Sequence, residues 1–241
     1  MTVPNQMRYL GKIMTAVCLV ITMGFTPNTT PHPQPVSTTV PPTGFARYHD
    51  LYEQLELAQA GLSREAFELG LKGMESLHNQ GVLENESVLS IADFSLPSNQ
   101  QRLFVIDLEQ GSVLFQTYVA HGRNSGKAMA TRFSNRANSF QSSLGFFVTG
   151  ETYTGKHGLS LRLDGQEPGI NDRALDRGIV MHSADYASAN WAARQGFIGR
   201  SLGCPAIPEE LHQSIISTIA HGSCFFIYAP QYTTAKGHKL V

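Results

Sequence analysis

The chain has few charged residues and no block of charge of one sign. Asp, Glu, Lys and Arg make up 15% of its 241 residues, and the formal net charge is −1. Without a basic block, nucleic acid is excluded as a main partner. The Cys-x-x-Cys and His-x-x-x-His spacings of zinc sites are also missing, so we expect neither a metal nor another cofactor.

Cysteine is scarce too, with three residues. Cys18 lies in the apolar N-terminal segment, outside the expected folded domain. Cys224 lies in the apolar run "GSCFFIYAP", which predicts a core strand and a buried thiol. Cys204 differs, because "GRSLGCPAIP" predicts a tight glycine-rich turn with an accessible sulfur. Spacing leaves two alternatives open: a disulfide between Cys204 and Cys224, or one reactive and one buried cysteine.

Glycine is frequent, with 22 residues, and hydrophobic residues make up 41% of the chain. This composition predicts one domain of ordinary size that is mainly β, with peripheral helices and extra segments. From residue 87 onward, short β-branched and aromatic runs are separated by glycine or polar turns, which is typical of strands. One of these runs, "RLFVIDLEQGSVLFQTYVA", predicts a hairpin that turns at Glu109-Gln110-Gly111.

The N-terminal segment predicts export. Arg8 and Lys12 precede an uncharged run from Ile13 to Phe25, the pattern of a secretory signal. This run is shorter than the ~20 residues of a membrane-spanning helix. We therefore expect a signal peptide or signal anchor at residues 1–25, a location in the periplasm or cell envelope, and a membrane tether if the segment is retained. Residues 26–44, rich in Pro and Thr and uncharged, predict an extended linker.

Helices are expected before the β-rich part of the chain and again just before its last strand. The spacing of Leu51 and Leu55 predicts a helix that Gly61 ends, and Ser63 is placed to cap a second one. A further helix is expected at residues 208–222, before the last strand. In order, we expect a helical hairpin, a β-rich domain and a C-terminal tail at residues 45–82, 83–232 and 233–241.

The turn that holds Cys204 suggests a nucleophile. A cysteine attacks as the thiolate, which a nearby imidazole or backbone N–H groups favour. Of the nine histidines, His182 ends the apolar run "GIVMH", so we expect it at the tip of a core strand, where it could act as the base. No acid is placed to orient the imidazole, so a backbone carbonyl near Ser183 is expected to do so. The N–H groups of Gly203 and Cys204 could stabilise an oxyanion.

These motifs together resemble the catalytic domain of murein L,D-transpeptidases. "MHSADY" followed by "GRSLGCPAIP" is similar to that family's histidine and Ser-x-Gly-Cys turn, in a divergent branch with proline after the cysteine. "SSLGFFVTGETY" is similar to its Thr-Pro-x-Gly-x-Phe strand, and the resemblance covers residues 88–230. It implies an L,D-transpeptidase-like β-sandwich or barrel with peripheral helices and an N-terminal helical pair. It also implies roles in the site for Cys204, His182, Ser183, Ser201 and Gly203.

Two positions depart from the family's common pattern. Leu202 stands where a second histidine is usual, and Ala206 where an arginine or asparagine is usual. A substrate contact is therefore missing or replaced, and Arg200 is the nearest replacement. Arginines bind carboxylates well, although turn-stabilising hydrogen bonds are the alternative role. Further substrate-binding candidates near strand ends are His121, Arg123, His157, Ser160 and Arg162.

The resemblance implies a cysteine acyltransferase that acts on peptidoglycan stem peptides, and we expect it to be a monomer. Cys204 would attack an L,D-peptide bond of a tetrapeptide stem, D-Ala would leave, and an amine of a neighbouring stem would resolve the thioester. Resolution by water would make the protein an L,D-carboxypeptidase. A non-catalytic cell-wall-binding module is a further alternative. The family's cysteine is typically acylated by carbapenems, which implies the same of Cys204.

Overall fold

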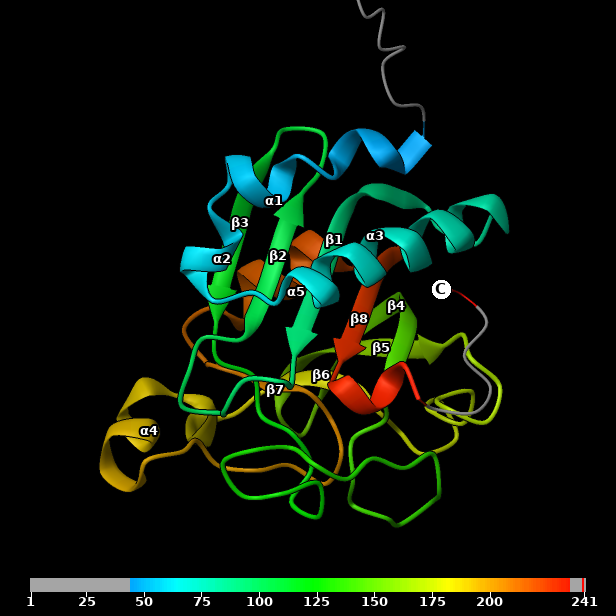
Figure 1. Cartoon of the computed structure of the whole chain (residues 1–241). Helices are drawn as coiled ribbons and strands as arrows, with labels where there is room; N and C mark the ends of the chain where they lie inside the picture. The colour runs from blue at the N-terminus through cyan, green and yellow to red at the C-terminus, as the bar shows by residue number, and fades with distance from the viewer. Residues whose placement is uncertain (1–43, 235–239, 241) are drawn as a thin grey trace, which may run out of the picture. The chain divides into compact units, whose positions relative to one another are not determined.

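The computed structural model describes residues 44–234 and 240 (Figure 1). The predicted signal segment 1–25, the linker up to residue 43 and most of the tail after residue 234 lie outside these ranges and stay predictions. Within the described ranges, no helix combines the length and the apolar character needed to cross a membrane.

A single eight-stranded sheet dominates the domain, in the order β3-β2-β1-β8-β4-β5-β6-β7 (Figure 1). β1 pairs with β8 and β6 pairs with β7 in parallel, and the other neighbours are antiparallel. The fold is therefore mainly β, as predicted. The strands are β1 (Asn85–Asp93), β2 (Leu103–Asp107), β3 (Ser112–Thr117), β4 (Gly145–Gly155), β5 (Gly158–Gly165), β6 (Val180–Ser183), β7 (Ala206–Ile207) and β8 (Ser223–Tyr228).

The hairpin predicted around Gly111 is confirmed. β2 and β3 pair antiparallel, and the connection ends at Gly111, whose φ is 59°. A glycine adopts this left-handed conformation without the strain that a side chain would cause. All five residues of β2 are buried, which explains why Leu103–Ile106 form a continuous apolar run rather than an alternating one.

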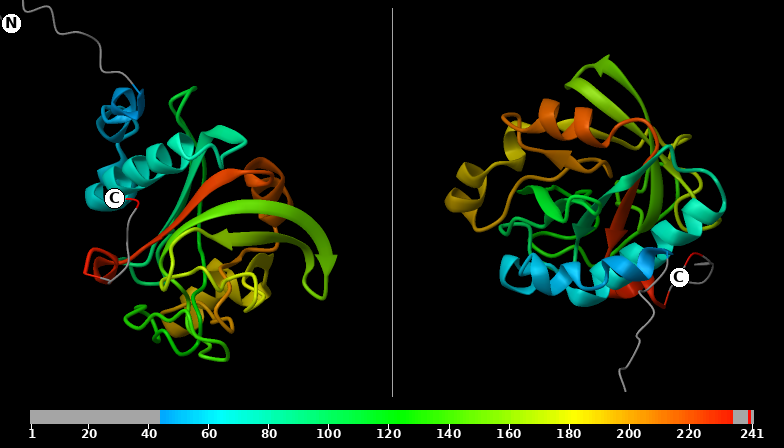
Figure 2. Two further views of the ribbon diagram at one scale, coloured as in Figure 1. Left: turned by 90° about the vertical axis from the view of Figure 1, so that its right-hand side faces the viewer. Right: turned by 90° about the horizontal axis from the view of Figure 1, so that it is seen from above.

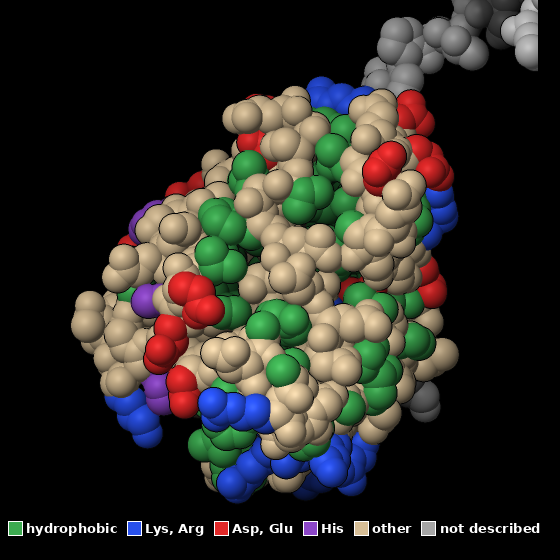
Figure 3. Space-filling view, turned by 90° about the vertical axis from the view of Figure 1, so that its left-hand side faces the viewer, with side chains coloured by type: hydrophobic (Ala, Val, Ile, Leu, Met, Phe, Trp, Pro, Cys, Tyr) green, Lys and Arg blue, Asp and Glu red, His purple; other side chains and the backbone are tan. Residues whose placement is uncertain are grey.

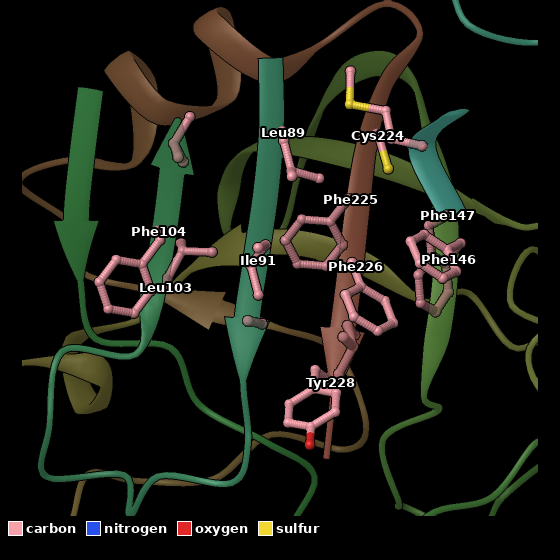
Figure 4. Packing of buried hydrophobic residues seen from close by; sticks show 14 of the residues in the cluster. Leu89, Ile91, Leu103, Phe104, Phe146, Phe147, Cys224, Phe225, Phe226 and Tyr228 are labelled. Atoms are coloured by element: carbon pink, nitrogen blue, oxygen red, sulfur yellow. The ribbon is translucent and has the colours of Figure 1, made fainter. Parts of the chain in front are cut away.

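Aromatic residues of β4 and β8 fill the core (Figure 4). Phe146 and Phe226 stack with their ring centroids 4.1 Å apart. Cys224 lies on the same strand as Phe226, is fully buried, and carries a free thiol. It therefore packs as a small apolar residue, as predicted. Cys204 is also a free thiol, so the alternative of a disulfide between the two is wrong.

Helix α3 (Arg64–Asn79) begins where the sequence predicts it. The Oγ of Ser63 accepts a hydrogen bond from the N–H of Ala66 at 3.3 Å, a standard N-terminal cap. α3 covers one face of β1 and β8, and α5 (His212–Ile219) lies on the other face (Figures 1 and 2). A Cβ on Gly73 would stand 2.0 Å from the Phe146 ring, so only glycine allows the helix this close to the sheet. α5 is shorter than the predicted helix at 208–222.

The first helix of the expected pair is not continuous. The chain instead forms a 3₁₀ turn and two short helices: η1 (Gly44–Tyr48), α1 (Leu51–Gln54) and α2 (Leu57–Ala60). Glu56 interrupts the helix with a left-handed φ of 51°. In one continuous helix, Leu51 and Leu57 would point about 120° apart, whereas the break lets both reach the core. Burial of Leu57 thus overrides the local helical pattern.

The two ends of the sheet meet beside the cysteine turn. Ala120, which follows β3, forms an antiparallel bridge with Ala206 of β7, and Gly122 forms a parallel bridge with Ser201. Hydrogen bonds at 2.8 Å join Ala120 N–H to the Ala206 carbonyl and Arg123 N–H to the Ser201 carbonyl. This seam, formed by residues 120–123 with 201–206, nearly closes the sheet into a barrel and fixes both sides of the turn.

Candidate active site

Parallel pairing of β6 and β7 brings His182 beside the cysteine turn. His182 lies opposite Ala206 in the register, and its N–H donates to the Pro205 carbonyl at 3.3 Å. Cys204 lies two residues before β7 begins. His182 and Cys204 therefore line one cavity of about 460 Å³, although the sequence separates them by a long loop. That loop carries α4 (Ala189–Gln195), a helix that the sequence analysis did not anticipate.

The turn holds its shape through Ser201 and Gly203. The Oγ of Ser201 donates to the Cys204 carbonyl at 2.6 Å and accepts from the Gly203 N–H at 3.0 Å. Gly203 has φ of 129°, and a Cβ there would come within 2.9 Å of the Gln141 carbonyl oxygen. The turn therefore requires this glycine. Because the Gly203 N–H is engaged inside the turn, it is not free to bind an oxyanion as the sequence suggested, and the Cys204 N–H is the candidate.

The sulfur of Cys204 is partly exposed and contacts the Gly178 carbonyl at 3.7 Å. Burial raises the pKa of this thiol above its usual value. The N–H of Val180 and the charge of Arg177 oppose that effect by favouring the thiolate. The effect of burial on the pKa is the larger one, so the resting group is a neutral thiol at pH 7 and needs a base for activation.

The imidazole of His182 is oriented to act as that base. Its Nδ1 lies 2.8 Å from the Ser183 carbonyl oxygen, which can only accept, so Nδ1 carries the proton and Nε2 is left basic. This contact agrees with the backbone carbonyl near Ser183 that the sequence predicts for orienting the imidazole. Burial lowers the pKa of His182, and the neighbouring His157 lowers it further. The imidazole is therefore neutral at pH 7.

His157 lies directly against His182. It comes from the tip of the β4–β5 hairpin, and the two rings stack with their centroids 4.5 Å apart. The Oγ of Ser183 donates to the His157 backbone carbonyl at 2.9 Å, which ties the hairpin tip to β6. Ser183 thus contributes twice, through its carbonyl to His182 and through its hydroxyl to the hairpin.

The remaining substrate-binding candidates divide into those inside and outside the cavity. Arg200 and Ser160 line it with Cys204. The Nη1 of Arg200 donates to the backbone carbonyls of Arg123 and Gly126, at 3.2 and 3.0 Å, so it also clamps the loop. Arg123 itself lines a neighbouring groove with Trp191. Figure 3 shows Lys and Arg side chains gathered at the end of the domain where α4 lies in Figure 1.

Arg162 and His121 do not reach the cavity. Arg162 is exposed on β5 and lies over the Tyr153 ring, 5.1 Å from its centroid. His121 is fully buried, and its Nδ1 accepts from Nη2 of Arg102 at 2.7 Å. Burial and the charge of Arg102 lower the pKa of His121 to about 3, so it is neutral. The His121 carbonyl accepts from the Ser201 N–H at 2.9 Å, so this residue supports the seam.

Three residues of the cavity and of the turn around Cys204 were not predicted from the sequence: Lys156, Arg177 and Tyr186. Lys156 and Tyr186 line the cavity, and burial raises the pKa of Tyr186 to about 12, so its hydroxyl keeps its proton. A Cβ on Gly199 would stand 2.4 Å from the Cβ of Tyr186, so glycine lets this side chain pack. The available signal was that Tyr186 follows His182 closely, in the 3₁₀ turn η2 (Asp185–Ala187) after β6.

The mouth of the cavity carries Leu202, which is 58% exposed. Within residues 44–234 and 240, no three His, Cys, Asp or Glu side chains form a group that could hold a metal ion. The cavity offers a thiol, an imidazole and the backbone groups around them.

A sequence model of the L,D-transpeptidase catalytic domain matches residues 58–228, and the chain belongs to that family. The chain is similar to the solved L,D-transpeptidase from Mycobacterium smegmatis, with 16% identity, a TM-score of 0.37 and coverage of 59% of either chain. L,D-transpeptidase 3 from Mycobacterium tuberculosis has 13% identity and a TM-score of 0.39, over 59% of this chain and 61% of that one. The matched part is thus less than two thirds of those chains. No curated protein matches significantly.

Proposed function

We propose that the protein is a peptidoglycan L,D-transpeptidase with Cys204 as nucleophile and His182 as base. The observation that carries this proposal is the bond from Nδ1 of His182 to the Ser183 carbonyl, which leaves Nε2 basic in the cavity that Cys204 lines. The family membership supports the same reaction class. Both partners are neutral at rest, as a thiol–imidazole pair that reacts by proton transfer should be.

The reaction proceeds through a thioester. Nε2 of His182 takes the proton of the Cys204 thiol as the sulfur attacks the carbonyl carbon of the L,D-peptide bond. The Cys204 N–H stabilises the oxyanion that forms. When the C–N bond breaks, the imidazolium returns the proton to the leaving D-Ala amine. An amine of a second stem then attacks the thioester, gives its proton to His182, and releases the thiol.

The lining of the cavity suits an anionic substrate. Lys156 and Arg200 line it, and no carboxylate of the described residues does. Stem peptides carry carboxylates, which these cations would attract. We propose in addition that the protein is exported and works as a monomer in the periplasm or cell envelope, where residues 1–25 would act as a signal or membrane tether.

Mass analysis of products tests the function. The purified protein is incubated with disaccharide-free tetrapeptide stems, alone and with an acceptor stem that carries a free amine. A transpeptidase forms a cross-linked dimer and releases D-Ala. Tripeptide without dimer would identify a carboxypeptidase, and unchanged stems would favour a wall-binding module.

The acid limb of the pH–rate profile should report His182. A lowered pKa means that the neutral base is fully present at pH 7 and is lost only as the pH falls below that value. We expect kcat/KM to be level near pH 7 and to fall with a midpoint below 6.5. His182→Ala should cost roughly 10²–10⁴-fold in kcat and remove this limb.

A matched control for that profile is His157→Gln. Because the charge of His157 lowers the pKa of His182, its removal should move the acid midpoint upward and keep turnover. An acid limb that persists unchanged in His182→Ala would exclude His182 as the base.

Arg200→Lys tests whether Arg200 binds a substrate carboxylate. If it does, the variant should lose ~1.5–3 kcal/mol of transition-state binding on a donor with a free terminal carboxylate. A donor with that carboxylate amidated should show no such loss. Equal losses on both donors would assign Arg200 solely to its bonds with the carbonyls of Arg123 and Gly126.

A further inference from the structure

Arg177 lies beneath the turn that carries Cys204. It is half-buried, and its Nη2 lies 3.4 Å from the position that a Cβ on Gly203 would take. The sulfur of Cys204 contacts the carbonyl of Gly178, the next residue along the chain, at 3.7 Å. Arg177 does not line the cavity, so its guanidinium approaches the turn from the side opposite the cavity.

The guanidinium is fixed by the loop that precedes β4. Its acceptors there are the carbonyls of Ser134 and Gln141, each at 2.7 Å, Ser139 Oγ at 3.3 Å, and Ser143 Oγ. Within this segment, the Oγ of Ser142 donates to the Gly203 carbonyl at 3.1 Å. Arg177 thus holds the segment that in turn holds Gly203. A lysine cannot serve this many acceptors at once, because its donors lie on one atom.

The other ionisable side chains that line the cavity with Cys204 are Tyr153, Lys156, His157, His182, Tyr186 and Arg200. His182 and Tyr186 are neutral at pH 7. Lys156 and Arg200 are exposed, so solvent and salt screen their charges, and the charge of His157 acts on the His182 ring stacked against it. Arg173 is exposed and repels Arg177. The half-buried guanidinium of Arg177, which keeps its charge at all working pH values, is therefore the least screened cation beside the sulfur.

We propose that Arg177 is a positioning residue that sets the reactivity of Cys204, by fixing the Gly203 side of the turn and by favouring the thiolate with its charge. Leu202 and Ala206, on either side of the cysteine, supply no charge to the turn. The inference rests on Cys204 being the nucleophile of the proposed function. The reactivity of the thiol, however, is measured without a peptide substrate, so the two proposals fail separately.

The test is alkylation of the full chain by iodoacetamide across a pH range, with the adduct at Cys204 read by peptide mass analysis. Arg177→Gln should raise the midpoint of the rate–pH curve by about one unit, a tenfold slower reaction at pH 7, and leave the limiting rate at high pH unchanged. Arg177→Lys should keep the midpoint through its charge and lose at least tenfold in kcat/KM on tetrapeptide stems. Arg173→Gln is the matched control and should change neither quantity.

An unchanged midpoint in folded Arg177→Gln would overturn the role of the charge. If that variant does not fold, Arg177→Lys provides the test. Turnover equal to that of the wild type would overturn the positioning role. An alkylation midpoint raised by one unit would overturn the claim that the charge at this position favours the thiolate. If the wild type shows no turnover but Arg177→Gln still raises the midpoint of the alkylation curve, the proposed function is contradicted and this inference stands.

Discussion

Cys204→Ala is expected to abolish turnover of tetrapeptide stems, with a loss of about 10⁴-fold or more. The sulfur forms the covalent intermediate in the proposed reaction, and an alanine offers no atom to do so. The variant should fold normally, because the thiol is partly exposed and its contact with the Gly178 carbonyl is weak. The measurement is product formation by mass analysis, with thermal unfolding as a check on the fold.

Cys224→Ser provides the internal control for this result. It should retain turnover and lose stability, because it places a hydroxyl in the fully buried core of β8. Intact-mass analysis after exposure to a carbapenem should show one adduct on the wild type and on Cys224→Ser, and none on Cys204→Ala. Equal loss of activity in a folded Cys224→Ser would contradict the choice of nucleophile.

Arg102→Leu is expected to lower the free energy of unfolding by roughly 3–5 kcal/mol. Arg102 is fully buried, and burial lowers its pKa to about 9. It donates to the carbonyls of Leu96 and Val119 and to Nδ1 of His121. A leucine would leave these buried acceptors without a donor. Urea denaturation measures the loss.

Arg132→Leu is the matched control for Arg102→Leu. This arginine is exposed in the loop before β4, so its replacement should change stability by about 0.5 kcal/mol or less. A loss below 1 kcal/mol in Arg102→Leu would mean that water or another group replaces the arginine, and that the cluster with His121 does not stabilise the seam.

The sequence predicts the strands well because the burial of each strand is visible in its own local pattern of apolar residues. The strands β2 and β8 are apolar except for Asp107 and Ser223 at their ends, and both are buried throughout. The turn at Gly111 and the cap at Ser63 are equally local signals. The break at Glu56 is different, because it depends on which face Leu57 must present to a core formed by distant strands.

The candidate site could be predicted only in part, for the same reason. Cys204 and His182 were found through their motif and its family resemblance, and the structure places both in one cavity. Alternation could not set Arg162 aside, because it places Arg162 on the same side of β5 as Ser160, which lines the cavity. Arg177 gave no local signal, since its partners lie in a loop far earlier in the chain.

The seam between residues 120–123 and 201–206 has a consequence for the order of events in folding. Its partners lie far apart in the chain, so joining them costs much loop-closure entropy. That cost falls once the intervening segments are held in the sheet, so we expect the seam to form late in folding. The nucleophile turn is shaped by that late contact. An incompletely folded chain would therefore carry Cys204 without the turn geometry of the folded protein, and the proposed site would be complete only after the last step of folding.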